Sequence, residues 1–411
     1  MKRDPIASLR LPDFRFFITA RLFMTLATQM QGLIVSWQIY QYTKDPLWLG
    51  MIGLTEAIPF ISSSLFAGHI ADIIERKKII TWATIMLMLC TGLLCGFTLN
   101  NGFVLHAYGV WPIYGIVFLS GIARAFIAPS YFAFLSQIVP RSEYPNASTW
   151  SSTTWQIGAV GGLSIGGLIY AWVGFTYSYA IDFGLLLIAL CSISFIPARP
   201  LPPKLEKERL FESLAKGVFF VFRNEEILGA LSLDLFAVLF GGAVAMLPIF
   251  ADKILKVGPE GLGLLRAAPA VGAVVMAAVM VYRPPLKNAG RNLLICVACF
   301  GICMILFALS TNFLLSMFIL ALSGAFDSVS VVIRGTILQL MTPDEMRGRV
   351  SAVNNIFIGS SNEIGEFESG VTAKLMRLIP SVIFGGSMTI LVVAYTSFKA
   401  KKLRRLQLEG K

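Results

Sequence analysis

Three glutamates lie within six residues of a strongly apolar part of the chain. Residues 360–370 read SSNEIGEFESG and hold Glu363, Glu366 and Glu368. On a helix with about 100° per residue, Glu363 and Glu366 lie about 60° apart, whereas Glu368 points about 140° or more from either. We therefore expect Glu363 and Glu366 to face one cavity, where burial would let them exchange protons near neutral pH. We expect Glu368 to contact a neighbouring helix. The alternative is structural, with each acid paired to a base.

Other charged residues also interrupt apolar segments. Glu56, Arg124, Arg266 and Asp327 each lie deep in such a segment. An unpaired charge inside a membrane is costly, so buried opposite charges are expected to be partners. Arg334 follows Asp327 by seven residues, which places the two about 20° apart on a helix, so both can face one cavity. These residues are candidates for proton coupling and for lining a substrate cavity.

Further polar and aromatic residues give weaker signals. Asp182 and Asp234 lie within apolar segments, where each could be a helix cap or a solvated group near the cytoplasm, and Asp234 is also a candidate cavity-lining residue. Trp155 could line an apolar pocket, although membrane tryptophans more often lie at the lipid interface. Three cysteines share one helix face without a nearby histidine or carboxylate, which favours small buried side chains over a metal site: Cys296, Cys299 and Cys303. No metal or cofactor is expected.

Long apolar segments carry these residues. The chain is 56% hydrophobic and 14% charged, against about 25% charged in an average soluble domain. The segments reach the about 20 residues that a helix needs to cross a bilayer. The sequence predicts an all-α integral membrane protein with twelve transmembrane helices, at residues 16–40, 47–71, 79–99, 112–138, 147–170, 177–197, 227–251, 261–282, 292–310, 313–340, 350–373 and 380–398. No removable signal peptide is expected, because the first residues are charged and no cleavage site follows the first segment.

The basic residues are distributed unevenly between the two sides of these segments. Of the 30 that lie outside the predicted helices, 25 fall on the side of both termini and five on the other. This is the positive-inside pattern, and it predicts cytoplasmic termini in a multi-pass protein of the bacterial cytoplasmic (inner) membrane. The net charge of +11 is therefore assigned to topology and anionic lipid headgroups, with no nucleic-acid partner.

The two halves of the chain are related by a sparse repeat. At an offset of 203 residues Gly162 aligns with Gly365 and Gly167 with Gly370, and at an offset of 210 Pro59 aligns with Pro269. Each offset maps one predicted helix onto the helix six later, which predicts two pseudo-symmetric six-helix halves with a substrate site between them. The expected domains are an N-terminal bundle, a cytoplasmic linker with an amphipathic helix, a C-terminal bundle and a basic tail, at 1–198, 199–225, 226–399 and 400–411. The amphipathic face holds Leu210, Phe211, Leu214, Val218, Phe219 and Phe222.

Motifs give a family resemblance. Residues 68–78, GHIADIIERKK, read as a tight turn and resemble the G-x-L-A-D-R-x-G-R-R/K signature of the major facilitator superfamily. The resemblance implies a cytoplasmic gate at Gly68, Asp72, Arg76 and Lys77. Ile73 and Glu75 replace the usual arginine and glycine of the signature.

A second motif resembles that of exporters in the same superfamily. Residues 158–167, GAVGGLSIGG, are similar to G-x-x-x-G-P-x-x-G-G, with Leu163 in place of proline. The resemblance implies helix packing at Gly158, Gly162, Gly166 and Gly167, where small residues allow close approach. Arg124 in GIARAF is similar to an arginine implicated in proton transfer among drug:proton antiporters. TPDEMRGRVSAVNN, from Thr342, and the ERKK ending resemble the enterobactin-exporter branch. Glu366 aligns with Leu163 through the repeat, which places the acids on the counterpart of a helix expected to move.

These observations together predict a transporter. We expect a proton-coupled exporter of a small amphiphilic molecule, a siderophore or a hydrophobic drug, that alternates access by rocking its halves as a monomer. Import or uniport of a small solute, and lipid handling, are the alternatives. No P-loop, nucleophile elbow or H-E-x-x-H pair is present, so an enzyme is not expected. The expected partners are the substrate, protons and membrane lipids.

Overall fold

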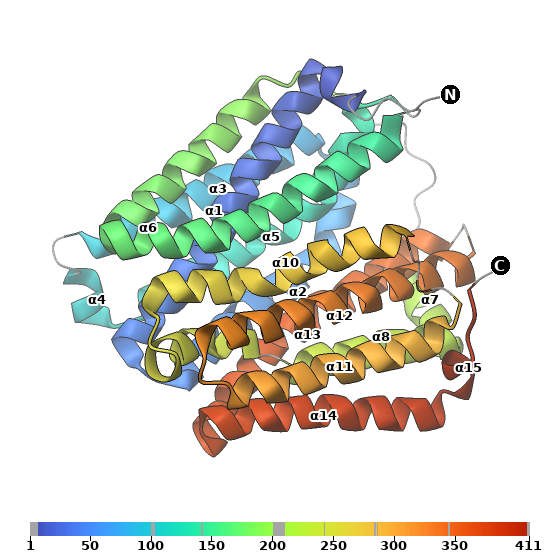
Figure 1. The fold of residues 1–411 in the computed structure, drawn as a ribbon. Coiled ribbons are helices and arrows are strands. Elements are labelled where there is room, and N and C mark those ends of the chain that lie inside the picture. The colour runs from blue at the N-terminus through green and yellow to red at the C-terminus, as the bar shows by residue number, and fades with distance from the viewer. Residues whose placement is uncertain are drawn as a thin grey trace. The chain divides into compact units, whose positions relative to one another are not determined.

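Helices make up the structure, a computed structural model that describes residues 7–99, 103–140, 143–199, 210–241, 243–282, 285, 287–343 and 346–408. No strand occurs in these ranges (Figure 1). The elements are η1 (Ser8–Arg10), α1 (Pro12–Thr43), α2 (Pro46–Ile73), α3 (Arg76–Thr98), α4 (Phe103–Tyr108), α5 (Trp111–Ile138), α6 (Tyr144–Ser194), α7 (Leu210–Arg223), α8 (Glu225–Phe240), η4 (Ala243–Met246), α9 (Leu247–Ile249), η5 (Phe250–Ile254), α10 (Gly258–Tyr282), α11 (Ala289–Leu309), α12 (Phe313–Met341), α13 (Arg347–Met376), α14 (Leu378–Lys399) and α15 (Lys401–Arg404).

Every predicted membrane segment overlaps a helix, but the segment boundaries differ. Residues 147–170 and 177–197 both fall on α6, in which two helical segments meet at a kink at Gly174, with φ 73° and ψ −173°. Residues 227–251 fall on α8 and on the short helical segments η4, α9 and η5 after it. Among the described residues, eight helical segments are long and apolar enough to cross a membrane, at Arg76–Thr98, Trp111–Ile138, Asn146–Ser194, Glu225–Ile254, Gly258–Met280, Ala289–Leu309, Phe313–Met341 and Leu378–Lys399.

Residue contacts group the chain into two compact units. The first unit holds Met1–Lys44, Thr55–Lys204 and Gly258–Ala267. The second unit holds Asp45–Leu54, Leu205–Val257 and Ala268–Lys411. The units therefore do not follow chain order throughout, because the start of α2 groups with the second unit and the start of α10 with the first.

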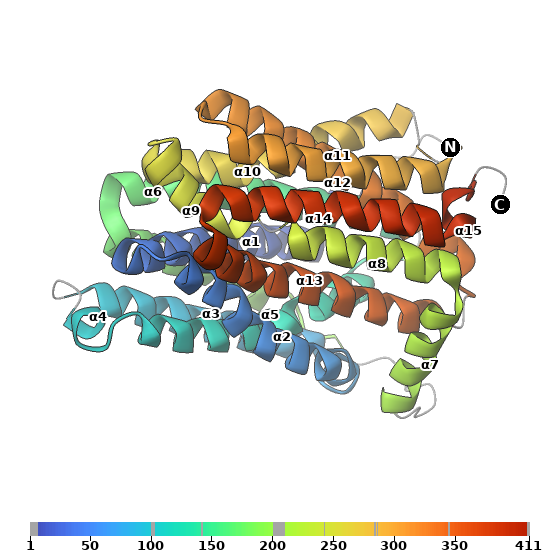
Figure 2. The same ribbon diagram turned by 90° about the horizontal axis from the view of Figure 1, so that it is seen from below.

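Each unit has its own apolar core. In the first unit, Phe14, Phe17 and Phe134 are fully buried with the end of α6. In the second unit, Ile227 and Leu293 are fully buried with Leu403 of α15. Helix α11 packs against both α12 and α14, and the two ribbon views show the three helices side by side (Figures 1 and 2). The buried apolar side chains of these helices pack into the core of their own unit.

Glycines at repeat-related positions make equivalent close contacts. A Cβ at Gly162 of α6 would lie 2.5 Å from the Leu26 carbonyl oxygen of α1, and one at Gly365 of α13 would lie 2.9 Å from the Leu239 carbonyl oxygen of α8. The next pair behaves alike, with Gly167 against Gly263 of α10. Gly370 in turn lies against Gly50 of α2. Backbones come this close only where no side chain intervenes.

The connection between α2 and α3 is shorter than the sequence predicts. The predicted turn over residues 68–78 is wrong in extent, since α2 continues to Ile73 and α3 begins at Arg76. The helical hydrogen bond from the Ile74 amide to the Ile70 carbonyl, 2.9 Å, leaves only Ile74 and Glu75 between the helices. The surroundings of Gly68 and the side chain of Asp72 lie outside the described part of the structure.

The predicted amphipathic linker helix corresponds to α7. Val218, Phe219 and Phe222 are exposed, while Gly217 lies against the Arg349 backbone of α13 in the same unit. The side chains of Leu210, Phe211 and Leu214 lie outside the described residues. The described face is thus apolar and open, which is typical of an interfacial helix.

Candidate functional site

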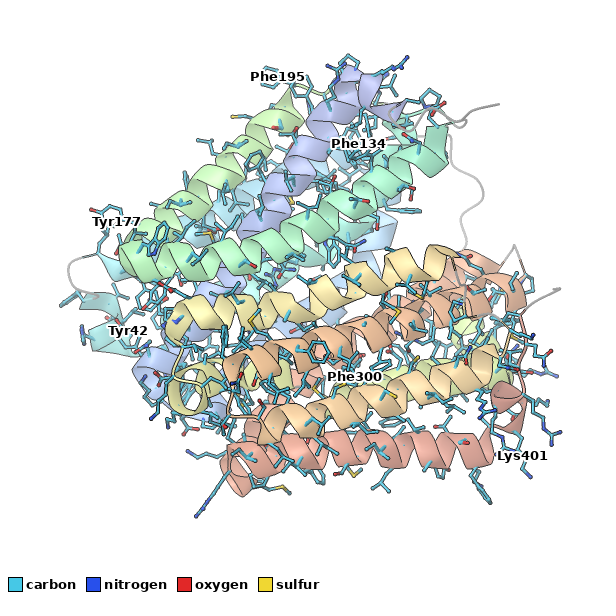
Figure 3. All side chains as sticks on the ribbon, in the orientation of Figure 1. Tyr42, Phe134, Tyr177, Phe195, Phe300 and Lys401 are labelled. Carbon is cyan, nitrogen blue, oxygen red and sulfur yellow. The ribbon has the colours of Figure 1, made fainter. Side chains whose placement is uncertain are left out.

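A cavity of about 240 Å³ lies inside the second unit. It is built by α8, α10, α11, α12 and α13. Its polar lining consists of Asp234, Ser323, Asp327, Ser330, Asn362 and Glu366. Its apolar lining includes Leu320, Phe326, Met304 and Phe300, the last of which is labelled in Figure 3 among the helices of this unit. Cavities with an apolar wall and a few convergent polar groups are typical of small-molecule sites.

Two aspartates line the cavity, and the arginine that pairs with one of them, Arg334, is not among the lining residues. Asp234 of α8 forms an ion pair with Arg334 of α12, and both side chains are almost fully buried. The sequence left open whether Asp234 is a helix cap or a solvated group. The buried ion pair shows that it is neither. The charge of Arg334 also acts on Asp327, which lies seven residues earlier on the same face of α12. Asp327 and Arg334 thus share one charged region, as their seven-residue spacing predicts, but the direct partner of Arg334 is Asp234.

The three glutamates of α13 differ in whether they line the cavity. Glu366 lines the cavity, whereas Glu363 and Glu368 are not among its lining residues. All three side chains are half-buried. A Cβ at Gly53 of α2 would lie 2.6 Å from the Glu366 Cβ and 2.5 Å from the Glu363 carbonyl oxygen. The acids therefore sit where the start of α2 passes close to α13.

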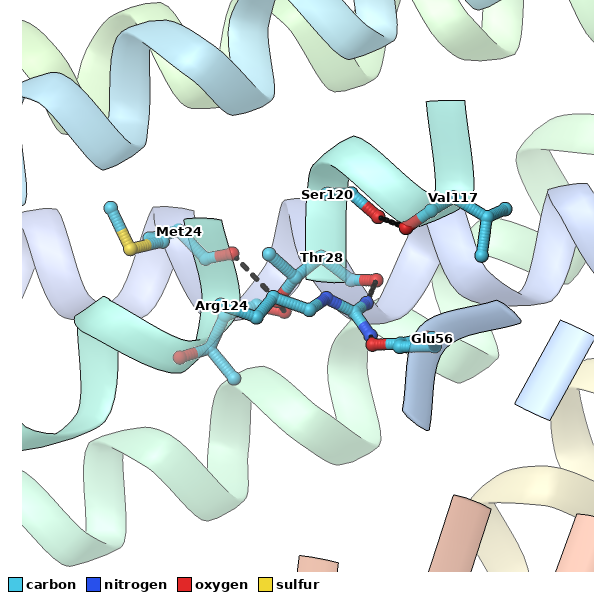
Figure 4. A network of polar contacts seen from close by, with 7 residues as sticks. Met24, Thr28, Glu56, Val117, Ser120 and Arg124 are labelled. Carbon is cyan, nitrogen blue, oxygen red and sulfur yellow. Dashed lines mark hydrogen bonds and ion pairs between the residues drawn. The ribbon is translucent and has the colours of Figure 1, made fainter. Parts of the chain in front are cut away.

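Arg124 and Glu56 form the charged site of the first unit. Arg124 of α5 pairs with Glu56 of α2 and donates a further hydrogen bond, 3.1 Å long, to the Thr28 carbonyl of α1 (Figure 4). The approach of the two helices is close here, because a Cβ at Gly121 would lie 2.9 Å from Pro59. The expectation that these opposite charges are partners is confirmed for this pair. Arg266, on the part of α10 that groups with this unit, is half-buried.

A buried polar network in the first unit was missed by the sequence reasoning. The Gln31 amide donates to the Thr91 hydroxyl, 2.8 Å away, and Thr91 donates to the Asp182 carboxylate at 3.0 Å. Asp182 is 0% exposed, and its Oδ1 has no hydrogen-bond partner among the described residues. Asp182 is therefore not a cap or a cytoplasm-near group, because α6 packs it between α1 and α3. The one signal in the sequence for this buried site is the position of Asp182 within an apolar segment.

The described gate residues hold the start of α3 in the first unit. Arg76 donates to the Ala133 carbonyl of α5 at 3.3 Å. Lys77 donates to the Ser194 carbonyl at the end of α6, 3.0 Å away, where the helix dipole favours a positive charge. Trp155, a candidate for lining a pocket or for the lipid interface, is 48% exposed and lies outside the cavity lining described above.

An ion pair at the end of α13 joins the loop before α2. Lys374 pairs with Asp45, which also accepts a 3.0 Å hydrogen bond from the Leu47 amide at the first turn of α2. Burial of Asp45 opposes its ionisation, but the hydrogen bonds from Lys374 and Leu47 and the lysine charge outweigh burial and lower the pKa of the carboxyl. Both residues belong to the second unit.

The chain is similar to known transporters along its whole length. The family profile described as "Transmembrane secretion effector" matches residues 3–409. The enterobactin exporter EntS of Escherichia coli O1:K1 / APEC is 25% identical over 404 residues, which cover 96% of this chain and 94% of the relative. That of Shigella boydii serotype 18 is 26% identical over 406 residues, with the same coverage.

Solved transporters share the fold. A POT family transporter in complex with 5-aminolevulinic acid has a TM-score of 0.73 at 10% identity over 96% of this chain and 97% of the other. The nucleoside transporter NupG has a TM-score of 0.70 at 12% identity over 94% of this chain and 99% of the other. The fold and the family are those of membrane transporters and not of enzymes. The chain therefore belongs to the transmembrane secretion effector family of the major facilitator superfamily.

Proposed function

We propose that the protein is a proton-coupled exporter of a small amphiphilic molecule, a siderophore or a hydrophobic drug, in the bacterial inner membrane. The observation that carries the proposal is the cavity of the second unit, which combines aromatic and aliphatic walls with Asp234, Asp327 and Glu366. The apolar walls suit the body of an amphiphile, and the carboxyls can bind either protons or a polar group of the substrate. The similarity to enterobactin exporters supports the direction of transport.

Proton coupling requires that protonation and substrate compete for the same carboxyl. Glu366 is the best-placed group, because it lines the cavity and lies on α13 where Gly53 of α2 passes closest. Protonation would neutralise Glu366 and weaken its hold on the polar group of the substrate. Glu56 and Arg124 form the corresponding charged pair of the first unit, and proton binding at Glu56 would release Arg124. Asp327 and Glu363 are further proton-coupling candidates.

The test is transport in proteoliposomes that contain the purified protein and an internal pH indicator. A pH gradient is imposed, and siderophores and hydrophobic cationic dyes are added singly. The native chain is compared with Glu366→Gln and with the matched control Glu368→Gln, which changes the same side chain two residues away, outside the cavity lining. We expect one compound to dissipate the gradient with the native chain and the control, and at least tenfold more slowly with Glu366→Gln, about 1.4 kcal/mol in transition-state terms.

Three outcomes would contradict parts of the proposal. Equal rates for all three proteins would remove Glu366 from the proton path. Equilibration of a compound without proton movement would indicate uniport. If no compound dissipates the gradient while the protein is folded and inserted, lipid handling becomes the better function.

A further inference from the structure

A second hollow lies on the surface of the second unit, where α11, α14 and α15 meet. Its volume is about 510 Å³. Leu294, Ile295, Ala298 and Val393 form its apolar floor. Its polar rim consists of Arg291, Ser397 and Arg404. The cavity proposed for transport shares none of these residues.

The fold brings the two rim arginines together from distant parts of the chain. The Gly290 amide, at the start of α11, donates a 3.2 Å hydrogen bond to the Leu406 carbonyl. Leu403 is fully buried in the core of the unit, and Leu406 is nearly so. These contacts hold the segment after α14 against the start of α11, and they leave Arg404 directed to the outside beside Arg291. Figure 3 shows Lys401 at the same end of the unit.

Within the described part of the chain, neither rim arginine is neutralised. The side chains of Arg291 and Arg404 make no hydrogen bond or ion pair to any residue that the structure describes. The nearby Lys402, by contrast, lies 3.7 Å from Glu225. Two guanidinium groups on one hollow repel each other unless an anion lies between them, and paired arginines are well suited to a phosphate.

The helices that build the hollow also carry exposed apolar side chains outside its polar rim. Ile295 and Ile302 of α11 and Leu391 of α14 are exposed apolar side chains on the helices that build the hollow. A ligand here would meet cations at one end and hydrocarbon along the rest. The distribution of basic residues predicts that this end of the helices lies at the cytoplasmic surface, where anionic lipids attract basic residues.

We propose that the α11–α14 hollow is a binding site for an anionic phospholipid. The phosphate lies between Arg291 and Arg404 and accepts hydrogen bonds from both, and an acyl chain lies over Leu294, Ile295 and Ala298. A bound lipid would thereby link α11 to the segment after α14. The proposal does not depend on the transported substrate or on proton coupling.

The test is lipid binding by native mass spectrometry of the detergent-purified full chain. Phosphatidylglycerol is titrated against phosphatidylcholine for the native protein, for Arg291→Gln/Arg404→Gln, and for the matched control Lys287→Gln/Arg405→Gln. The control removes the same charge from exposed side chains nearby that do not line the hollow. We expect the native protein and the control to prefer phosphatidylglycerol, and the rim variant to bind it about tenfold more weakly.

Several results would overturn the proposal. An equal loss in the control would mean that the surface attracts anionic lipid without a defined site. Unchanged binding in the rim variant would remove the two arginines from any site, and equal binding of phosphatidylcholine would leave only the apolar floor. Competition by glycerol phosphate at similar concentrations would identify a free phosphate site instead. If the double variant does not fold, Arg404→Gln against Arg405→Gln gives the same comparison at exposed positions.

Discussion

Thr91 links two buried polar side chains, those of Gln31 and Asp182. Its hydroxyl accepts from Gln31 and donates to Asp182, inside the first unit. Thr91→Val would leave an amide and a carboxyl group unsatisfied, so we expect the protein to lose about 1–3 kcal/mol of stability. Thr84→Val is the matched control, because Thr84 is equally buried on α3 but, among the described residues, its hydroxyl bonds only to the Ile80 carbonyl of its own helix.

Thermal unfolding of both variants in detergent, followed by near-UV circular dichroism, measures this difference. A loss of stability by Thr91→Val that is no larger than the loss by Thr84→Val would contradict a structural role of the network. The same comparison with Asp182→Asn, which can still accept from Thr91, separates the hydrogen bond from the carboxyl proton.

At the residue scale, the sequence predicted which charges lie within helices better than it predicted their partners. Glu56 and Arg124 pair as opposite charges should. The partner of Arg334 is Asp234, because helix α8 lies beside α12 and brings its carboxyl within reach. Asp182 and Asp234 could not be told from caps or solvated groups, since exposure depends on which helices pack around them. Hydropathy and spacing along the sequence do not show which helices pack around a given aspartate.

At the element scale, α6 depends on a break that only glycine accommodates. Gly174 has φ 73° and ψ −173°, a region open almost only to glycine, and no heavy atom lies within 4 Å of the position of a Cβ. Gly174→Ala should therefore cost about 1–3 kcal/mol through backbone strain alone. Gly184→Ala is the control, because Gly184 lies in the regular helix with equally open space, and alanine should be neutral or stabilise by up to about 1 kcal/mol.

Unfolding temperatures of the two variants check this prediction. If Gly174→Ala matches Gly184→Ala, the break is not required and the two apolar segments can form one straight helix. The sequence predicted two helices here with a gap at residues 171–176, and this gap contains the break. It could not predict how short the connection is, because hydropathy does not report backbone angles.

The loop before α2 gives a pH-dependent prediction. The pKa of Asp45 is lowered in the folded protein, so its ionised form stabilises the fold above the unfolded pKa, and this contribution is lost as the pH falls through the folded pKa. Asp45→Asn keeps an acceptor for the Leu47 amide but removes the charge that Lys374 binds. We expect it to be less stable than the native protein at neutral pH by less than about 1 kcal/mol, because the pair is partly exposed.

Melting temperatures across a pH series test the sign. The native protein and Asp45→Asn should begin to converge near the ordinary aspartate pKa of about 3.9 and should match only once the pH has fallen through the lower pKa of the folded state. Lys374→Gln should show the same pH trend, because it removes the other partner. A difference that stays constant down to about pH 3 would assign the effect to the first turn of α2 and not to the ion pair.

At the scale of the whole molecule, the sparse repeat predicted contacts better than it predicted chemistry. Gly162 and Gly365 both press against a neighbouring backbone, as do Gly167 and Gly370. Small residues at helix contacts are constrained by geometry, so they persist at both repeat positions. The cavity is not repeated in this way, because its carboxyls at Asp327 and Glu366 align with Arg124 and Leu163, neither of which is acidic. The polar cavity could therefore be located only in the folded structure.

This asymmetry in charge predicts which substrates the cavity accepts. Three carboxyls line it, and one of them is neutralised by Arg334. The remaining acidic groups and the aromatic walls favour an amphiphile with a positive charge. We expect phenyltrimethylammonium to bind about tenfold more tightly than tert-butylbenzene, which has the same shape without the charge. Asp327→Asn should remove most of this preference and leave the neutral ligand unaffected, which competition binding to the purified protein would measure. Equal affinity of the two ligands would mean that the carboxyls bind protons and that the apolar walls alone select the substrate.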